Sequence, residues 1–160
     1  MSSTTPGRSA QNERELVLTR VFAAPRPLVF QCWTDSEHMK NWFGPRMFTN
    51  PTCQLDVRTG GTWRIVMRGP DGTEHVATGV YQEVIPNERL VFTNIAEDSN
   101  GARLLEGITT VTFEDHGAGT KLTLRTRMTG LVPAAPAMLD GMEAGWSQSL
   151  DRLTEELEAV

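Results

Sequence analysis

Five residues of the 160-residue chain are the candidates for acid–base chemistry: Asp56, His75, Glu83, and the adjacent Asp115 and His116. A general acid or base must lie in a cleft that tunes its pKa. Asp115 and His116 fall in an expected hairpin turn, His75 adjoins another, and Glu83 has no fixed face. The chain also lacks a nucleophile elbow, a phosphate-binding glycine loop and a helically spaced carboxylate pair. The sequence therefore identifies no catalytic residue. It favours a protein that is not an enzyme without deciding the question.

Metal-ligating residue types are few and scattered. Cys32 and Cys53 form no CxxC motif, and His38, His75 and His116 form no cluster with ligand spacing. We therefore predict no metal site and no cofactor. A reduced, cytoplasmic protein is the default expectation for such cysteine usage, although pairing of the two cysteines stays open.

The overall composition excludes some partners. Hydrophobic residues make up 39% and charged residues 22% of the chain, with a net charge of -5, so we expect no nucleic-acid surface. The N-terminal stretch MSSTTPGRSAQNERE has no apolar segment typical of a signal peptide. No later run reaches the ~18 apolar residues of a spanning helix, so we expect no membrane contact.

Elements before residue 130 follow from periodicity. Residues 1-13 lack it and are predicted to be a flexible tail, with a single domain over 14-160. The stretch ELVLTRVF alternates as a half-buried strand does, and APRPLVFQCWTD and SEHMKNWF read as two short helices. Asp35 is the expected N-cap of the second helix, and Gly44 and Pro45 its end. From residue 51 to 129 the pattern has period two with regular turn signals, which predicts consecutive antiparallel strands.

The C-terminal segment predicts one long amphipathic helix that includes MLDGMEAGWSQSL, residues 138-150. A helical wheel centred on Trp146 gathers an apolar face: Met138, Leu139, Met142, Leu150, Leu153 and Leu157. We therefore predict an α+β fold. Its strongly curved antiparallel sheet of six to seven strands wraps around this helix, with two short helices after the first strand.

Three stretches together resemble a known family: VFAAPRPLVFQCWTDSEHMKNWFGP, GGTWRIVMRGPDGTEHVATGVYQEVIPNERLVFT and GWSQSLDRLTEEL. They are similar to the bacterial family named after the activator of the ninety-kilodalton heat-shock chaperone ATPase, within the START-like (SRPBCC) superfamily. The resemblance runs from about residue 15 to 158. It implies a helix-grip fold with a cavity between helix and sheet. The superfamily hosts lipid binders, polyketide cyclases and co-chaperone-like domains, so fold alone does not give function.

The composition of the expected helix face supports a cavity independently. Glycine inside a helix costs roughly 1 kcal/mol relative to alanine, so Gly145 suggests that space is kept, whereas Gly141 has no explanation. Methionines suit ligands of variable shape, and as a set they favour a pocket over a solid core. The Ser149 hydroxyl either orients a ligand or bonds back to the carbonyl four residues earlier, and the second role needs no ligand.

Candidate contacts come from the sheet and from the helix. We predict ligand-binding side chains at Trp63, Ile65, Met67, Tyr81, Phe92, Met138, Met142, Trp146 and Ser149. The pocket mouth is predicted to consist of Trp42, Phe43 and Met47, which could equally form a hydrophobic plug.

We therefore predict a protein that binds a small hydrophobic or aromatic molecule, with the family name suggesting a link to stress response. One alternative is a chaperone-binding domain resembling the ATPase activator. Another is an enzyme resembling polyketide cyclases or aromatases, which would need an acid or base in the cavity. A monomer or weak homodimer is expected.

Overall fold

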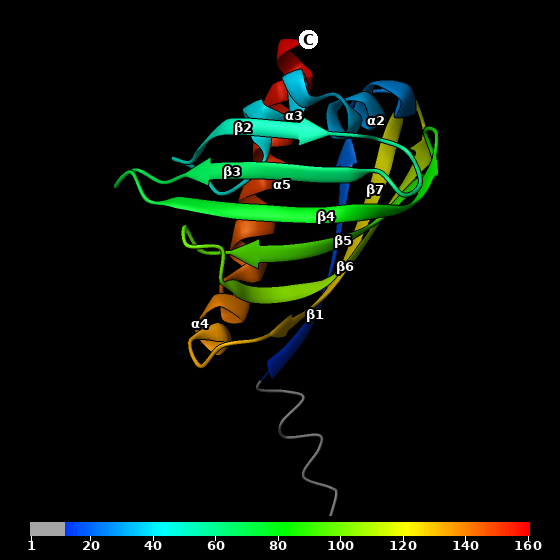
Figure 1. The fold of residues 1–160 in the computed structure, drawn as a ribbon. Coiled ribbons are helices and arrows are strands. Elements are labelled where there is room, and N and C mark those ends of the chain that lie inside the picture. The colour runs from blue at the N-terminus through cyan, green and yellow to red at the C-terminus, as the bar shows by residue number, and fades with distance from the viewer. Residues whose placement is uncertain (1–11) are drawn as a thin grey trace, which may run out of the picture.

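A single antiparallel sheet is the main element of the fold. The computed structural model describes residues 12–160, in which seven antiparallel strands pair in the order β1-β7-β6-β5-β4-β3-β2. The strands are β1 (Glu13–Phe22), β2 (Thr49–Leu55), β3 (Thr62–Arg68), β4 (Glu74–Ile85), β5 (Arg89–Glu97), β6 (Arg103–His116) and β7 (Gly119–Gly130). Figure 1 shows the sheet curving around the C-terminal helix, as predicted. The α+β class and the strand number are confirmed.

Strand β7 shows why one side of the sheet is covered. Leu122 and Leu124 are fully buried, while Arg125 and Arg127 are exposed. Successive side chains of a strand point to opposite faces, so the alternation in the sequence places the apolar residues toward the helices and the arginines toward solvent.

The two short helices after β1 are also confirmed as α2 (Arg26–Thr34) and α3 (Ser36–Trp42). Pro25 is the N-cap of α2, where its missing N–H costs nothing. The Asp35 carboxylate caps α3 by accepting a hydrogen bond from the Glu37 N–H at 2.9 Å. Figure 1 shows both helices at the end of the molecule where the chain terminates.

The C-terminal helix begins later than predicted. Helix α4 (Ala135–Asp140) and helix α5 (Met142–Ala159) are separated at Gly141, so the expectation of one helix through Met138 is wrong. The Gly141 N–H donates to the Met138 carbonyl, three residues back, at 3.2 Å. Such a tightened turn is common at helix ends, and glycine is a poor residue for helix interiors. Gly141 is thus explained as the junction.

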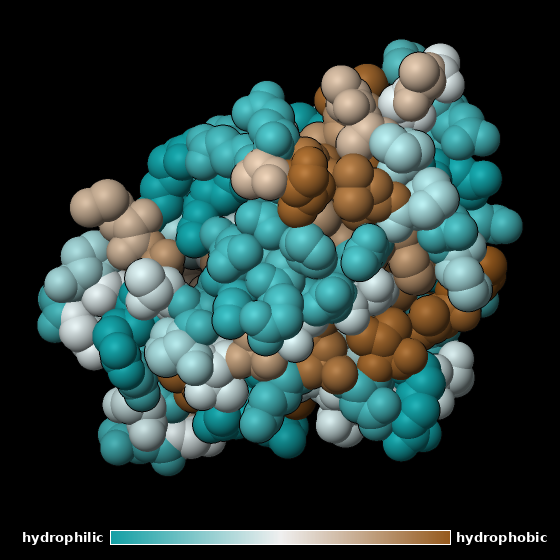
Figure 2. Space-filling model, turned by 90° about the horizontal axis from the view of Figure 1, so that it is seen from above, coloured by the Kyte–Doolittle hydropathy of each residue, from teal (hydrophilic) through white to brown (hydrophobic). Residues whose placement is uncertain are grey.

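The aromatic part of the core lies where α2, α3 and α5 meet the sheet. The Trp33 and Trp42 rings lie edge to face with centroids 4.8 Å apart, and Trp33 stacks on Trp146 at 6.1 Å. Leu150 and Leu153 of α5 are fully buried there. Figure 2, the view from above, shows a surface that is mostly hydrophilic with hydrophobic side chains in separate groups.

The flexible tail predicted over 1-13 lies mostly outside the described residues, and its last residue, Glu13, already belongs to β1. None of the helices within residues 12–160 is long and apolar enough to cross a membrane.

Candidate ligand cavity

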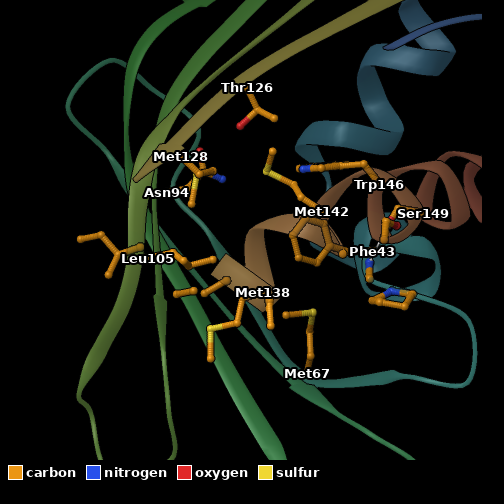
Figure 3. A pocket seen from close by; sticks show the side chains of 18 of the residues that line it. Phe43, Met67, Asn94, Leu105, Thr126, Met128, Met138, Met142, Trp146 and Ser149 are labelled. Atoms are coloured by element: carbon orange, nitrogen blue, oxygen red, sulfur yellow. Dashed lines mark hydrogen bonds between the residues drawn. The ribbon is translucent and has the colours of Figure 1, made fainter. Parts of the chain in front are cut away.

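The N-terminal end of α5 does not pack solidly on the sheet. A cavity of about 340 Å³ lies between the sheet and the junction of α4 and α5, and we call it the helix–sheet cavity. Figure 3 shows side chains of both walls directed toward it. Its lining residues are Phe43, Gly44, Pro45, Trp63, Met67, Ala77, Asn94, Ile95, Ala96, Leu105, Thr126, Met128, Ala137, Met138, Gly141, Met142, Gly145, Trp146 and Ser149. The volume lies at the lower end of the ~300–1,000 Å³ typical of ligand sites.

Small residues on both walls keep this space open. On the sheet, Ala77 of β4 pairs directly with Ala96 of β5. On the helix side, a Cβ added at Gly145 would meet nothing nearer than the Pro45 ring at 3.9 Å, and one at Gly141 only backbone oxygens. Larger side chains at these positions would extend into the cavity.

Methionine dominates the larger side chains of the wall. Met67 and Met128 approach from the sheet, and Met138 and Met142 from the helices. Methionine is flexible and polarisable, so it adapts to ligands of different shape. The wall contains no Asp, Glu, His, Lys, Arg, Cys or Tyr among the described residues. The cavity is therefore uncharged.

The loop of residues 43-45, which forms one side of the cavity, is held by α5. The Ser149 hydroxyl accepts from the Gly44 N–H at 3.0 Å and donates to the Gly145 carbonyl at 3.1 Å. The Arg152 guanidinium donates to the carbonyls of Phe43, Gly44 and Pro45 at 3.2, 2.9 and 2.9 Å. Burial lowers the pKa of Arg152. Helix and loop therefore form one wall.

The structure brings together two thirds of the predicted ligand-binding residues. Six of the nine predicted ligand-binding residues line the helix–sheet cavity: Trp63, Met67, Met138, Met142, Trp146 and Ser149. Ser149 does so with its hydroxyl engaged in the loop contact, and this includes the bond to the carbonyl four residues earlier that the sequence analysis favoured.

Ile65, Tyr81 and Phe92 lie elsewhere. They surround a separate cavity of about 10 Å³ in the aromatic core, the core cavity, which is closed off by side chains of α2 and α3. The Tyr81 and Phe92 rings lie edge to face at 6.2 Å, and burial raises the Tyr81 pKa. Tyr81 is not a polar group of the helix–sheet cavity. Alternation gave the correct face of the sheet but not which helix covers each position.

Of the three residues predicted for the pocket mouth, one lines the cavity. Phe43 lines the cavity, but Trp42 is fully buried and its indole N–H donates to the Cys32 carbonyl at 2.9 Å, so it fixes α3 on α2. Met47 is 78% exposed and does not line the cavity. Trp42 therefore matches the alternative of a hydrophobic plug, whereas Met47 belongs neither to the wall nor to the core.

The candidate acids and bases lie outside the helix–sheet cavity. Its wall includes none of the five candidates, which are Asp56, His75, Glu83, Asp115 and His116. All but Glu83 are exposed, and Glu83 is half-buried and forms an ion pair with Arg89 at 2.6 Å. Cyclase-like chemistry would require an acid or base here, and none of these residues supplies it.

The cysteine question is resolved in favour of free thiols. Cys32 is buried, Cys53 is partly buried, and neither forms a disulfide. Burial, followed by the nearby Glu156 carboxylate, raises the Cys32 pKa to about 11. Burial likewise raises the Cys53 pKa to about 11. No group of three His, Cys, Asp or Glu side chains within residues 12–160 could hold a metal ion.

Sequence reasoning missed most of the sheet wall. The residues not predicted include Asn94, Ile95 and Ala96 of β5, Leu105 of β6, and Thr126 and Met128 of β7. Thr126 and Met128 carried a usable signal, since they continue the inward face of β7. Asn94 is a polar residue in an apolar strand, which is a signal in itself.

A curved antiparallel sheet holding a long helix, with an uncharged cavity between them, is the helix-grip arrangement of the START-like superfamily. The family model described as Activator of Hsp90 ATPase homolog 1-like protein matches residues 23–158. The chain belongs to this family, which confirms the resemblance drawn from the sequence.

Solved structures agree with this assignment. An uncharacterised protein from Rhizobium leguminosarum is similar at 29% identity with a TM-score of 0.79, covering 92% of this chain and 96% of that one. A protein from Chromobacterium violaceum is similar at 28% identity with a TM-score of 0.78, covering 90% of this chain and 96% of that one. The AHSA1 protein from Silicibacter pomeroyi is similar at 26% identity with a TM-score of 0.77, covering 91% of this chain and 99% of that one. No curated protein matches the chain significantly.

Proposed function

We propose that this chain binds a small hydrophobic or aromatic molecule in the helix–sheet cavity. The observation that carries the proposal is the wall itself, which keeps about 340 Å³ between two rows of small residues and is lined by four methionines, Phe43 and two tryptophans. A concave apolar pocket of this size with few polar groups is the usual form of a small-molecule site.

Affinity would come mainly from buried apolar area, at roughly 25 cal/mol per Å² before the costs of association. The rigid loop of residues 43-45, fixed by Ser149 and Arg152, would hold one wall in place before the ligand arrives. The chaperone-binding alternative rests on the family name alone.

A substitution that fills the cavity tests the proposal. Gly145→Leu adds a side chain to the wall where the nearest atom is 3.9 Å from the new Cβ. Ala144→Leu is the matched control, because it adds a leucine to the adjacent, exposed position of the same helix. We expect the neutral dye N-phenyl-1-naphthylamine to fluoresce on binding to the wild-type chain and to the control. We expect at least a tenfold weaker affinity for Gly145→Leu.

The outcome separates cavity binding from surface binding. Equal affinity of Gly145→Leu and Ala144→Leu for the dye would contradict the proposal, as would a wild-type chain that does not bind it. Circular dichroism of both variants checks that the helix content is unchanged.

A further inference from the structure

The helix–sheet cavity has one polar feature on its sheet wall. Asn94 of β5 lines it, and its amide oxygen accepts a hydrogen bond from the Thr109 hydroxyl at 2.7 Å. The Thr109 hydroxyl lies 2.8 Å from the Thr126 hydroxyl. Thr109 and Thr126 are 0% and 1% exposed, so the chain of three side chains is built into the sheet. Figure 3 shows Asn94 beside Thr126, across the cavity from Met142 and Trp146.

The number of hydroxyl hydrogens determines which side chain donates in each of these hydrogen bonds. A threonine hydroxyl has one hydrogen, and that of Thr109 is used on Asn94. Thr126 must therefore donate to Thr109. In the opposite direction the Ile108 carbonyl would be the remaining protein acceptor for the Thr126 hydroxyl, and it lies 3.4 Å away, beyond the 2.5–3.0 Å of a good O–H···O bond. The amide oxygen of Asn94 is thus engaged and its orientation fixed.

The other half of the Asn94 side chain remains available. Its NH₂ group has two donor hydrogens, and within residues 12–160 no protein acceptor lies within hydrogen-bonding distance of it. Apart from Thr126, the rest of the sheet wall is apolar, so a ligand that fills the cavity without an acceptor would leave this donor unpaired, which is costly.

We infer that the ligand, given the proposed function, is an uncharged, mainly apolar molecule with one carbonyl, ether or hydroxyl oxygen that accepts a hydrogen bond from the Asn94 amide. An anion is disfavoured because the wall contains no Lys, Arg or His among the described residues, so a buried carboxylate would lack a counter-charge. Thr109 and Thr126 are positioning residues that hold the amide with its N–H groups toward the cavity.

Matched probes of one shape test the inference. The three probes are 1-acetonaphthone, which carries a carbonyl, 1-isopropenylnaphthalene, in which a CH₂ replaces that oxygen, and the 1-naphthoate anion. Each is titrated against the dye-loaded full chain at pH 8. The quantity measured is the ratio of ketone affinity to alkene affinity, compared between the wild type and Asn94→Leu, so that the different water solubilities cancel.

We expect this ratio to be about five- to tenfold higher in the wild type, as one hydrogen bond provides. Thr109→Val keeps Asn94 but removes its anchor, and we expect it to lower the ratio as well. If Asn94→Leu does not fold, the affinity ratio of Thr109→Val tests the inference in its place. Asn100→Leu, at an exposed turn position, is the control and leaves the ratio unchanged. We expect 1-naphthoate to bind at least tenfold more weakly than the ketone.

Failure of the Asn94 role and failure of the proposed function give different experimental results. If ketone and alkene both displace the dye and their ratio is the same in the wild type and the variants, the role of Asn94 is overturned and the proposed function stands. Naphthoate binding as tight as that of the ketone would overturn the uncharged ligand class. If the wild type binds neither the dye nor any probe, the proposed function falls and this inference falls with it.

Discussion

Replacing Arg152 with methionine should destabilise the fold by removing the contact between α5 and the loop of residues 43-45. The Arg152 guanidinium donates to four backbone carbonyls, those of Asn41, Phe43, Gly44 and Pro45, at 2.9 to 3.2 Å. Its Nη1 reaches three of them with two hydrogens, so at most three of the four bonds are well aligned at once.

The magnitude follows from the donor charge and the exposure. A hydrogen bond from a charged group contributes about 1.5–3 kcal/mol, and the contributions are not additive. Arg152 is only partly buried, so water replaces part of what is lost. We therefore expect a loss of about 2–3 kcal/mol in the free energy of unfolding. For a chain of this length that corresponds to a fall in Tm of about 5–10 °C.

Arginine and methionine have similar helix propensities, so the helix itself is not perturbed. Urea denaturation monitored by tryptophan fluorescence measures the change. Arg125→Met, on the exposed face of β7, is the control and should change stability by less than about 0.5 kcal/mol. If Arg152→Met behaves like this control, the loop is not held by Arg152 and the account of this wall is wrong.

Two further results are expected from single positions. Gly145→Ala should stabilise the chain by about 0.5–1 kcal/mol because it lies inside α5 with room for a Cβ. Gly44→Ala should destabilise it by about 1–3 kcal/mol, since φ is +95° and Met67 lies 3.1 Å from the new Cβ; thermal unfolding of both variants checks these opposite signs. Because burial raises the pKa of Cys32 and Cys53 to about 11 and also limits access of the reagent, alkylation by iodoacetamide at pH 8 should be at least about tenfold slower in the native than in the urea-unfolded chain. Equal rates in the two states would contradict this.

The arrangement of the sheet could be predicted because it depends on local patterns. Period-two alternation in β7 specifies which side chains face inward, and the Asp35 cap is encoded by a single residue before an amphipathic stretch. These features need no knowledge of distant parts of the chain. The family resemblance then gave the same arrangement.

The outline of the cavity could not be predicted in the same way. Tyr81 and Phe92 face inward as expected, yet they lie beside Trp33 of α2 and Met39 of α3 and so belong to the core. Alternation contains no information about which part of a face a helix covers. The role of Asn94 depends on Thr109 and Thr126, which are 15 and 32 positions away in sequence and adjacent only through strand pairing.

Methyl NMR of the methionines tests the central claim most directly. Met67, Met128, Met138 and Met142 line the helix–sheet cavity, whereas Met39 lies in the core and Met47 is exposed, so the chain contains its own controls. In a titration of the ¹³C-methyl-labelled chain with N-phenyl-1-naphthylamine, we expect the signals of the four lining methionines to shift. Those of Met39 and Met47 should stay in place. Shifts confined to Met47, or no shift at the four lining methionines while the dye binds, would contradict the account.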